Sequence, residues 1–198
     1  MACPYTARMA LDQPSPEPGG KALPDLWLIS DARNDAALED ALVALPRGSG
    51  FIYRHYHLDL ETRRARFHIL QKLAQKYGHL TILSDSPVLA RKWQADGVYG
   101  AAAAMPHGGE LLKLVTAHDW KEIVAADRAG ADAILLSPVF ATRSHPEAKP
   151  LGRTRFRMLA QKAKAPVIAL GGMNAQRARR MKWRRWAAID GLGWSKDS

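Results

Sequence analysis

Two segments decide the fold of this chain: ADAILLSPVFATRSHPEAKPLG at residues 131–152 and APVIALGGM at residues 165–173. Each contains a short apolar run, at residues 134–136 and 167–170, of the kind that a strand buried on both faces shows. Between the two segments, residues 153–164 alternate apolar and basic positions with the period of a helix. The sequence therefore predicts a strand, a long loop, a helix and a second strand. Long loops after parallel strands are where such folds bind ligands.

The same alternation of strands and helices continues on both sides of this unit. The predicted strands are residues 26–29, 50–53, 80–83, 97–99, 113–117, 134–136, 167–170 and 188–194. The predicted helices are residues 35–45, 60–77, 87–94, 119–129, 153–164 and 175–186, with a short helical piece near Glu110 to Leu112. Eight strands alternating with helices predict a (β/α)8 TIM barrel, an α/β fold, with an open doubly wound sheet as the alternative.

The barrel is expected to form one domain over residues 25–198, preceded by a flexible arm at residues 1–24 that is rich in Pro, Gly, Ser and Ala. No helix is expected after the eighth strand, so the arm covers that flank, or a second copy of the chain does, or the barrel has a bare side. In the helix at residues 60–77, Phe67, Leu70 and Ala74 are expected on the buried face and Arg63 on the side that faces water.

The composition is that of an ordinary globular protein, with 47% hydrophobic and 24% charged residues. No apolar run approaches the roughly 20 residues that a membrane span needs, and no secretory signal is recognisable. The single cysteine, Cys3, excludes an internal disulfide bond. We therefore expect a cytoplasmic protein without a membrane partner.

The chain carries a formal net charge of +10, with its densest basic run at residues 177–185. A solvated outer face of an amphipathic helix is the expected role of this run, and nucleic acid is not an expected partner. The alternative is a polyanion-binding or nucleic-acid-binding protein that uses this basic helix. A phosphorylated small molecule would also suit the positive charge.

In a barrel the chemistry lies at the carboxyl ends of the strands. The residues at these ends are Asp31, Arg54, Asp85, Tyr99, His118, Thr142, His145, Gly171, Gly172 and Gly193. Such a polar set of mixed charge would suit a phosphorylated heterocycle. The other histidines show no convergent spacing and no H-E-x-x-H motif, so a zinc site is not expected.

The segment S-P-V-F-A-T-R-S-H-P, followed by P-L-G and A-L-G-G-M, resembles the thiamine-phosphate synthase and thiazole tautomerase (TenI-like) family. The form of the motif is similar to a divergent branch found fused to Nudix hydrolases. The resemblance is specific over residues 132–174 and weaker from residue 26 to residue 193. It implies a barrel of thiamine metabolism that binds a phosphorylated thiazole or thiamine phosphate.

The resemblance also implies which residues hold the phosphate. In the family, the Gly-Gly loop, here Gly171 and Gly172, shares the phosphate with the loop after strand eight, here near Gly193. Arg54 matches the arginine of the family's Q-x-R-x-K motif, although Ile52 and Tyr56 stand at the Gln and Lys positions. An ion pair of Arg54 with Asp31 or Asp85 is the alternative.

Magnesium is possible but doubted. Ser84 and Asp85 stand where the synthases have Asn-Asp, and that Asp binds magnesium in the family. The position of the second carboxylate is Ala104. His145 replaces a lysine that touches pyrophosphate, whereas Thr142 and Ser144 keep the hydroxyl groups of the motif. We therefore expect at best a poor magnesium-dependent synthase.

His118 matches the histidine that acts as acid and base in the tautomerases. The resemblance thus implies that His118 is the catalytic residue of a metal-independent proton transfer, in which the pKa of an ordinary histidine, about 6.5, is suitable. A catalytically inactive paralogue that only binds its ligand is the alternative.

Overall fold

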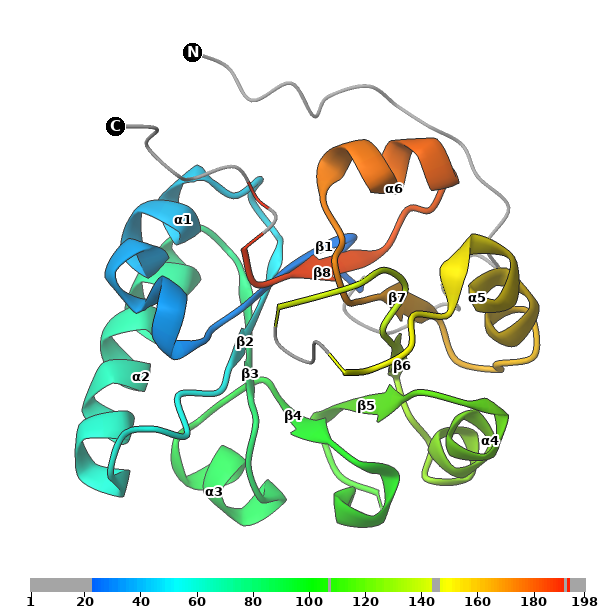
Figure 1. Cartoon of the computed structure of the whole chain (residues 1–198). Coiled ribbons are helices and arrows are strands. Elements are labelled where there is room, and N and C mark those ends of the chain that lie inside the picture. Colours follow the sequence, from blue (N-terminus) through cyan, green and yellow to red (C-terminus); the bar gives the residue numbers. More distant parts are fainter. Residues whose placement is uncertain (1–22, 107, 144–146, 191, 193–198) are drawn as a thin grey trace.

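The computed structural model describes residues 23–106, 108–143, 147–190 and 192. Eight parallel strands pair in chain order and close into a barrel, with β8 next to β1 (Figure 1). The strands are β1 (Leu26–Ile29), β2 (Gly50–Tyr53), β3 (Leu80–Leu83), β4 (Gly97–Gly100), β5 (Leu112–Ala117), β6 (Ala133–Leu136), β7 (Val167–Ala169) and β8 (Trp186–Ala188). The predicted closed barrel is confirmed, and the open doubly wound sheet is wrong.

The helices surround the strands (Figure 1). They are η1 (Ala32–Ala37), α1 (Leu38–Ala44), α2 (Leu60–Lys76), α3 (Pro87–Lys92), η2 (Ala102–Ala104), α4 (Trp120–Arg128), α5 (Gly152–Ala160) and α6 (Ala175–Met181). Between β4 and β5, the described residues form a single short 3-10 helix, η2. No helix of the described chain is both long and apolar enough to span a membrane.

Two apolar layers hold the barrel together. The interior is filled by Trp27, Ile52, Ile82 and other inward-pointing side chains, and the second layer lies between the strands and the helices. Gly50 makes room for Trp27, because a Cβ atom at Gly50 would lie 2.1 Å from the indole ring. The interior is therefore packed with side chains, so a ligand can bind only at the rim of the barrel.

Several predicted elements differ from the structure at their ends. The helix predicted at residues 153–164 is α5, which ends at Ala160. The last strand is Trp186–Ala188 rather than residues 188–194, and the preceding helix ends at Met181 rather than residue 186. Lys182 ends this helix because it adopts a left-handed conformation with φ of 49°. The helical piece predicted near Glu110 to Leu112 is absent, and Leu112 instead begins β5.

After β8 the structure describes only Ile189, Asp190 and Leu192, so the expected absence of a final helix stays a prediction. The outward-pointing side chains on this flank, Trp186 and Ala188 of β8 and Leu28 of β1, are nevertheless buried. Their burial within one chain gives no support to a second copy at this flank, and the homo-oligomer stays a prediction. The predicted arm at residues 1–24 lies almost wholly outside the described residues.

Candidate active site at the barrel mouth

The two-residue period of the strands builds the polar mouth of the barrel. Ile29, Ile52 and Ile82 point into the barrel, so the residues two positions later, Asp31, Arg54 and Ser84, follow on the same face. By the same rule Tyr99 of β4 is inward, and His118 follows β5 on that face. Burial raises the pKa of Tyr99 to about 12, so its hydroxyl stays protonated. The mouth therefore combines a cation, a carboxylate, hydroxyls and an imidazole.

The Gly171–Gly172 turn lies against the long loop that follows β6. Both glycines have positive φ, 91° and 59°. A Cβ atom at Gly171 would lie 2.6 Å from Pro138 Cα, and one at Gly172 would lie 2.4 Å from the carbonyl oxygen of Ala141. Only glycine satisfies both the backbone conformation and this close approach.

Hydrogen bonds of this turn use its carbonyl groups and leave its N–H groups. Phe140 N–H donates to Gly171 O at 3.0 Å, and the Arg177 guanidinium donates to Gly172 O. The N–H groups of Gly171, Gly172 and Met173 donate to no acceptor within the described residues. Three consecutive unused donors beside an exposed loop are suited to an anion.

Arg54 is held through its backbone while its guanidinium remains available. Its N–H donates to Ser30 Oγ at 2.7 Å, and its carbonyl accepts from Arg63 Nε at 2.8 Å. The guanidinium stacks 5.4 Å from the ring centre of Tyr56. The alternative ion pairs are wrong, because neither Asp31 nor Asp85 comes within 4 Å of it in the described chain.

Those two carboxylates have other arginine partners. Burial raises the pKa of the Asp31 carboxyl, but hydrogen bonds from Arg33 outweigh this and hold the pKa below its usual value. Asp85 pairs with Arg63 of α2. Arg63 is buried, so its predicted position on the side of the helix that faces water is wrong. Arg63 also donates to Ser84 O at 2.8 Å. Arg63 therefore clamps the ends of β2 and β3.

Magnesium does not fit the residues present. One oxygen of Asp85 is taken by Arg63 and the other accepts from Ser86 N–H at 2.7 Å. Ala104, at the position of the second carboxylate, carries no ligand atom. Within the described chain no three His, Cys, Asp or Glu side chains gather as a metal site would require. Tyr56, in place of the family's lysine, instead forms a hydrogen bond with Ser84 Oγ.

His118 follows β5 and has a fixed ring orientation. Its Nδ1 lies 2.8 Å from Glu122 Oε2, and the same oxygen accepts its backbone N–H at 2.7 Å. A carboxylate only accepts, so Nδ1 carries the proton and the Nε2 lone pair is available in the neutral ring. The His118 side chain is 58% exposed, which keeps it open to a ligand. Glu122 was missed in the sequence, although it lies four residues after His118.

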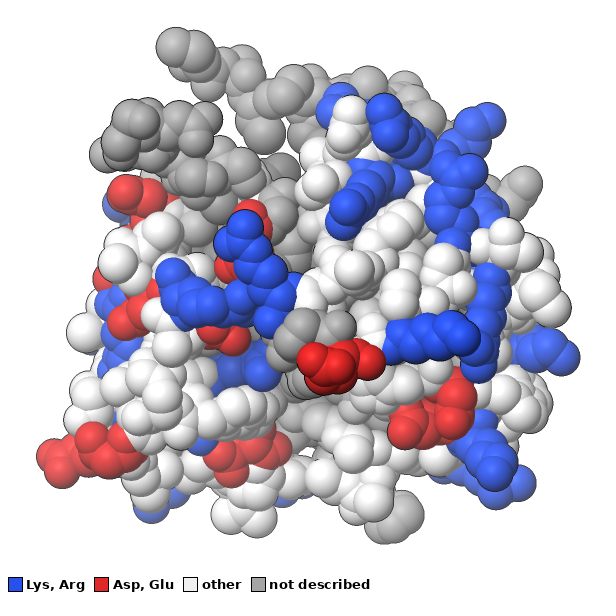
Figure 2. Space-filling model, in the orientation of Figure 1, with Lys and Arg blue, Asp and Glu red and all other residues white. Residues whose placement is uncertain are grey.

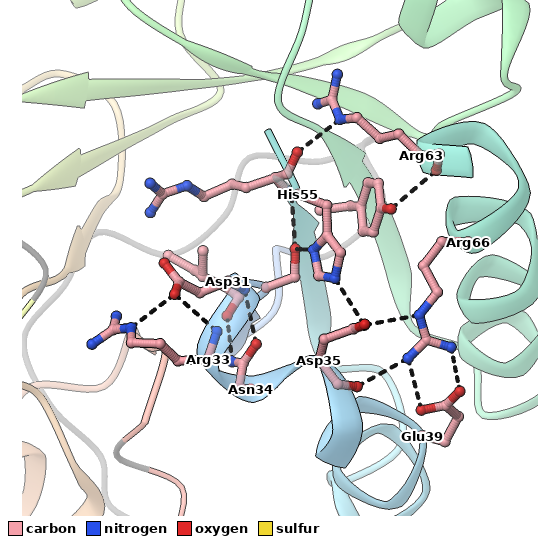
Figure 3. A network of polar contacts seen from close by, with 12 residues as sticks. Asp31, Arg33, Asn34, Asp35, Glu39, His55, Arg63 and Arg66 are labelled. Carbon is pink, nitrogen blue, oxygen red and sulfur yellow. Dashed lines mark hydrogen bonds and ion pairs between the residues drawn. The ribbon is translucent and has the colours of Figure 1, made fainter. Parts of the chain in front are cut away.

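A partly buried network next to the mouth resembles a hydrolytic triad but cannot act as one (Figure 3). His55 lies between Ser30 Oγ at 2.9 Å and Asp35 Oδ1 at 2.8 Å, and Arg66 joins Asp35 to Glu39. Ser30 is fully buried, so no substrate reaches its hydroxyl. Burial lowers the pKa of His55, and its bond to Asp35 offsets this only in part. The network positions Arg54 through Ser30.

The remaining predicted residues are only partly covered by the structure. Thr142 is half-buried on the loop after β6, one residue beyond the contact of Ala141 with Gly172. Ser144, His145 and Gly193 lie outside the described residues. The carboxyl end of β8 instead brings Asp190 to the rim, where it lies 3.3 Å from Arg33.

An open cavity of about 420 Å³ lies at the opposite, amino-terminal end of the barrel. Two of its polar side chains already have partners: His79 bonds the N–H of Ser49 and the carbonyl of Leu42, and Asp96 accepts from Thr81. Since none of the mouth residues lines it, we assign the chemistry to the mouth. The lining residues are Pro24, Gly48, Gln75, Gly78, His79, Leu80 and Asp96.

Comparison with known proteins agrees with this geometry. A family model described as thiamine monophosphate synthase (TMP-TENI) matches residues 26–189. The chain belongs to the thiamine monophosphate synthase family. The resemblance seen in the sequence is thus confirmed, and the family places the chain in thiamine biosynthesis. The fused Nudix branch stays a prediction.

Members of the thiamine monophosphate synthase family align along most of the barrel. The thiamine-phosphate synthase of Chloroflexus aurantiacus is 30% identical over 167 residues, which are 77% of this chain and 76% of the relative. The Aquifex aeolicus protein called "Putative thiamine-phosphate synthase 2" is 34% identical over 112 residues, 52% of this chain and 59% of that protein. The solved thiamine phosphate pyrophosphorylase of Pyrococcus furiosus has a TM-score of 0.70 at 24% identity, covering 83% of this chain and 85% of the other. This likeness confirms the fold.

Proposed function

We propose that the chain binds a phosphorylated thiazole or thiamine phosphate at the barrel mouth and transfers a proton within it without a metal. The observation that carries the proposal is the His118–Glu122 pair at the end of β5, on the rim that also bears the unused N–H groups of residues 171–173. Family membership supports the ligand class.

The phosphate would accept hydrogen bonds from the N–H groups of Gly171, Gly172 and Met173. The guanidinium of Arg54 would supply the positive charge. His118 Nε2 would take a proton from one position of the bound thiazole, and the imidazolium would return it to another. No atom is gained or lost, and no leaving group needs a metal to neutralise it. Glu122 stabilises the imidazolium and fixes the ring.

Ligand binding and catalysis can be tested separately. A thermal-shift screen in EDTA would use thiazole phosphate, thiamine phosphate, phosphate and pyrophosphate. A ligand at 100 times its Kd stabilises the protein by about 2.7 kcal/mol. Exchange of ring hydrogens in D2O, followed by NMR, would report proton transfer. His118→Gln is expected to slow exchange by about 10²- to 10⁴-fold with nearly unchanged affinity.

Glu122→Gln serves as the companion variant, because it keeps the shape of the side chain and removes its charge. It should slow exchange with nearly unchanged affinity for thiazole phosphate, since the imidazolium loses the carboxylate that stabilises it. Normal exchange in His118→Gln would refute the catalytic proposal. Binding without any exchange in the native protein would instead favour the inactive paralogue, for which the loss of the magnesium ligands is the supporting observation.

A further inference from the structure

The positive charge of the chain is concentrated in one continuous segment. Residues 148–189 contain twelve of the 29 Lys and Arg residues and none of the 19 Asp and Glu residues. The rest of the chain therefore holds 17 basic and 19 acidic residues and is close to neutral. An evenly spread net charge of +10 would mainly affect solubility. Because the charge is concentrated in one segment, it produces a positive electrostatic potential on one side of the barrel.

The structure places the two helices of this segment side by side. The Arg157 guanidinium of α5 donates to Met181 O at the end of α6, and the ring of Phe156 lies 4.9 Å from that of Trp183. Both helices pack on the outside of the barrel, with their N-terminal ends at its rim. Figure 2 shows Lys and Arg gathered on the side of the molecule where α5 and α6 lie. One surface thus combines charges that are separate in the sequence.

Most of these cations are exposed and lack a carboxylate. We define the α5–α6 basic surface by six exposed cations that have no carboxylate within 4 Å in the described chain: Arg153, Arg155, Lys164, Arg179, Arg180 and Lys182. Three more exposed cations of the segment also lack such a carboxylate but lie at the edge of this surface or contact other groups: Lys149, Arg157 and Lys162. Among the described residues, Asp25 forms ion pairs with the segment, through Arg184 at 2.6 Å and Arg185 at 3.8 Å. Asp127 accepts only from the backbone N–H groups of Lys164 and Ala165 in this part of the chain. A solvated helix face normally intersperses both signs, so this surface is arranged for an anionic partner.

The chemistry of the surface favours a phosphodiester backbone over a lipid bilayer. Four of its six cations are arginines, whose planar fork binds phosphate oxygens in pairs. The apolar faces of both helices, with Phe156 and Ala178, are buried against the barrel and cannot insert into a bilayer. Met158, 59% exposed, is the one large apolar side chain exposed on these helices in the described chain.

We propose that the α5–α6 basic surface binds nucleic acid through its phosphate backbone, without reading base sequence. This role lies beyond the proposed activity and uses residues outside the barrel mouth. It revises the expectation that the basic run is only a solvated helix face, because the partner helix α5 and the lack of carboxylates are visible only in the structure.

The test is fluorescence anisotropy with a labelled 24-base-pair DNA duplex and an RNA duplex of the same length, at 50–200 mM NaCl. Each phosphate contact contributes about −0.9 to the slope of log K against log salt for B-DNA. Six contacts predict a slope of about −5 and an affinity loss of about 10³-fold across this range. The triple variant Arg155→Gln, Arg179→Gln, Arg180→Gln should lower the magnitude of the slope by about 2.7.

A matched control removes three charges from the other side of the barrel: Lys72→Gln on α2 with Arg91→Gln and Lys92→Gln on α3, all exposed. It should keep the native slope for both duplexes. Equal losses in the two triple variants would overturn the proposal, because net charge alone would then explain binding. A native slope shallower than −2, or binding to phosphatidylserine vesicles without binding to either duplex, would overturn it as well.

Discussion

Replacing Gly171 by alanine tests how the turn proposed to bind phosphate is built. An alanine at φ of 91° carries backbone strain of about 1–2 kcal/mol. Its Cβ would also lie 2.6 Å from Pro138 Cα and 3.2 Å from Val139 N, which are backbone atoms that cannot rotate away. The loop must then move and weaken the hydrogen bonds from Val139 N–H to Leu170 O and from Phe140 N–H to Gly171 O, each worth about 1 kcal/mol. We expect a total loss of about 3–4 kcal/mol.

Gly48→Ala is the matched control, because Gly48 has φ of 77° and nothing within 4 Å of an added Cβ. It carries the strain without the collision and should cost only about 1–2 kcal/mol. Urea unfolding of both variants measures the free energies, with m-values compared to confirm one transition. Equal losses for the two variants would show that the turn does not press against the 138–141 loop, and the reasoning would fail.

Two further predictions concern the buried polar groups. Arg63→Met should lower the free energy of unfolding by about 3–5 kcal/mol in urea, because Asp85 and the carbonyl groups of residues 54 and 84 lose their partner. Arg64→Met, on the exposed face of the same helix, should change this free energy by less than about 0.5 kcal/mol. Similar losses in the two variants would contradict the role of Arg63. Burial lowers the pKa values of His55 and His79 in the folded chain. Below pH 6.5 the unfolded chain therefore binds more protons than the folded chain, and acidification lowers the free energy of unfolding. The urea concentration at the unfolding midpoint should therefore decrease when the pH is lowered from 7.5 to 5.5. A midpoint that stays constant or rises on acidification would count against neutral buried histidines.

The sequence predicted the strands better than the ends of the helices. Short, mostly apolar runs such as residues 80–83, followed by loop residues, favour strands buried on both faces, and their regular alternation with helical patterns made the closed barrel predictable. The helix before β8 was predicted too long because Lys182, which ends it, is not a glycine and gives no signal in the sequence. The last strand was therefore placed too late, and the rim residue Asp190 was not recognised.

Two site residues were missed although the sequence held their spacing. Arg63 lies at helical spacing from Phe67, Leu70 and Ala74, which are all buried, and only its charge led to its assignment to the wet face. Glu122 lies four residues after His118, at a spacing that favours contact once α4 begins at Trp120. The partners of charged groups depend on the packing of distant elements.

The most direct test of the phosphate-binding mouth is an amide NMR titration of the ¹⁵N-labelled protein with thiazole phosphate in EDTA. Hydrogen bonds from Gly171, Gly172 and Met173 to the phosphate should move these three amide signals downfield in a saturable way. The same three signals should move first when inorganic phosphate is used alone. Saturable shifts confined to α5 and α6, or no shift at residues 171–173, would contradict the account.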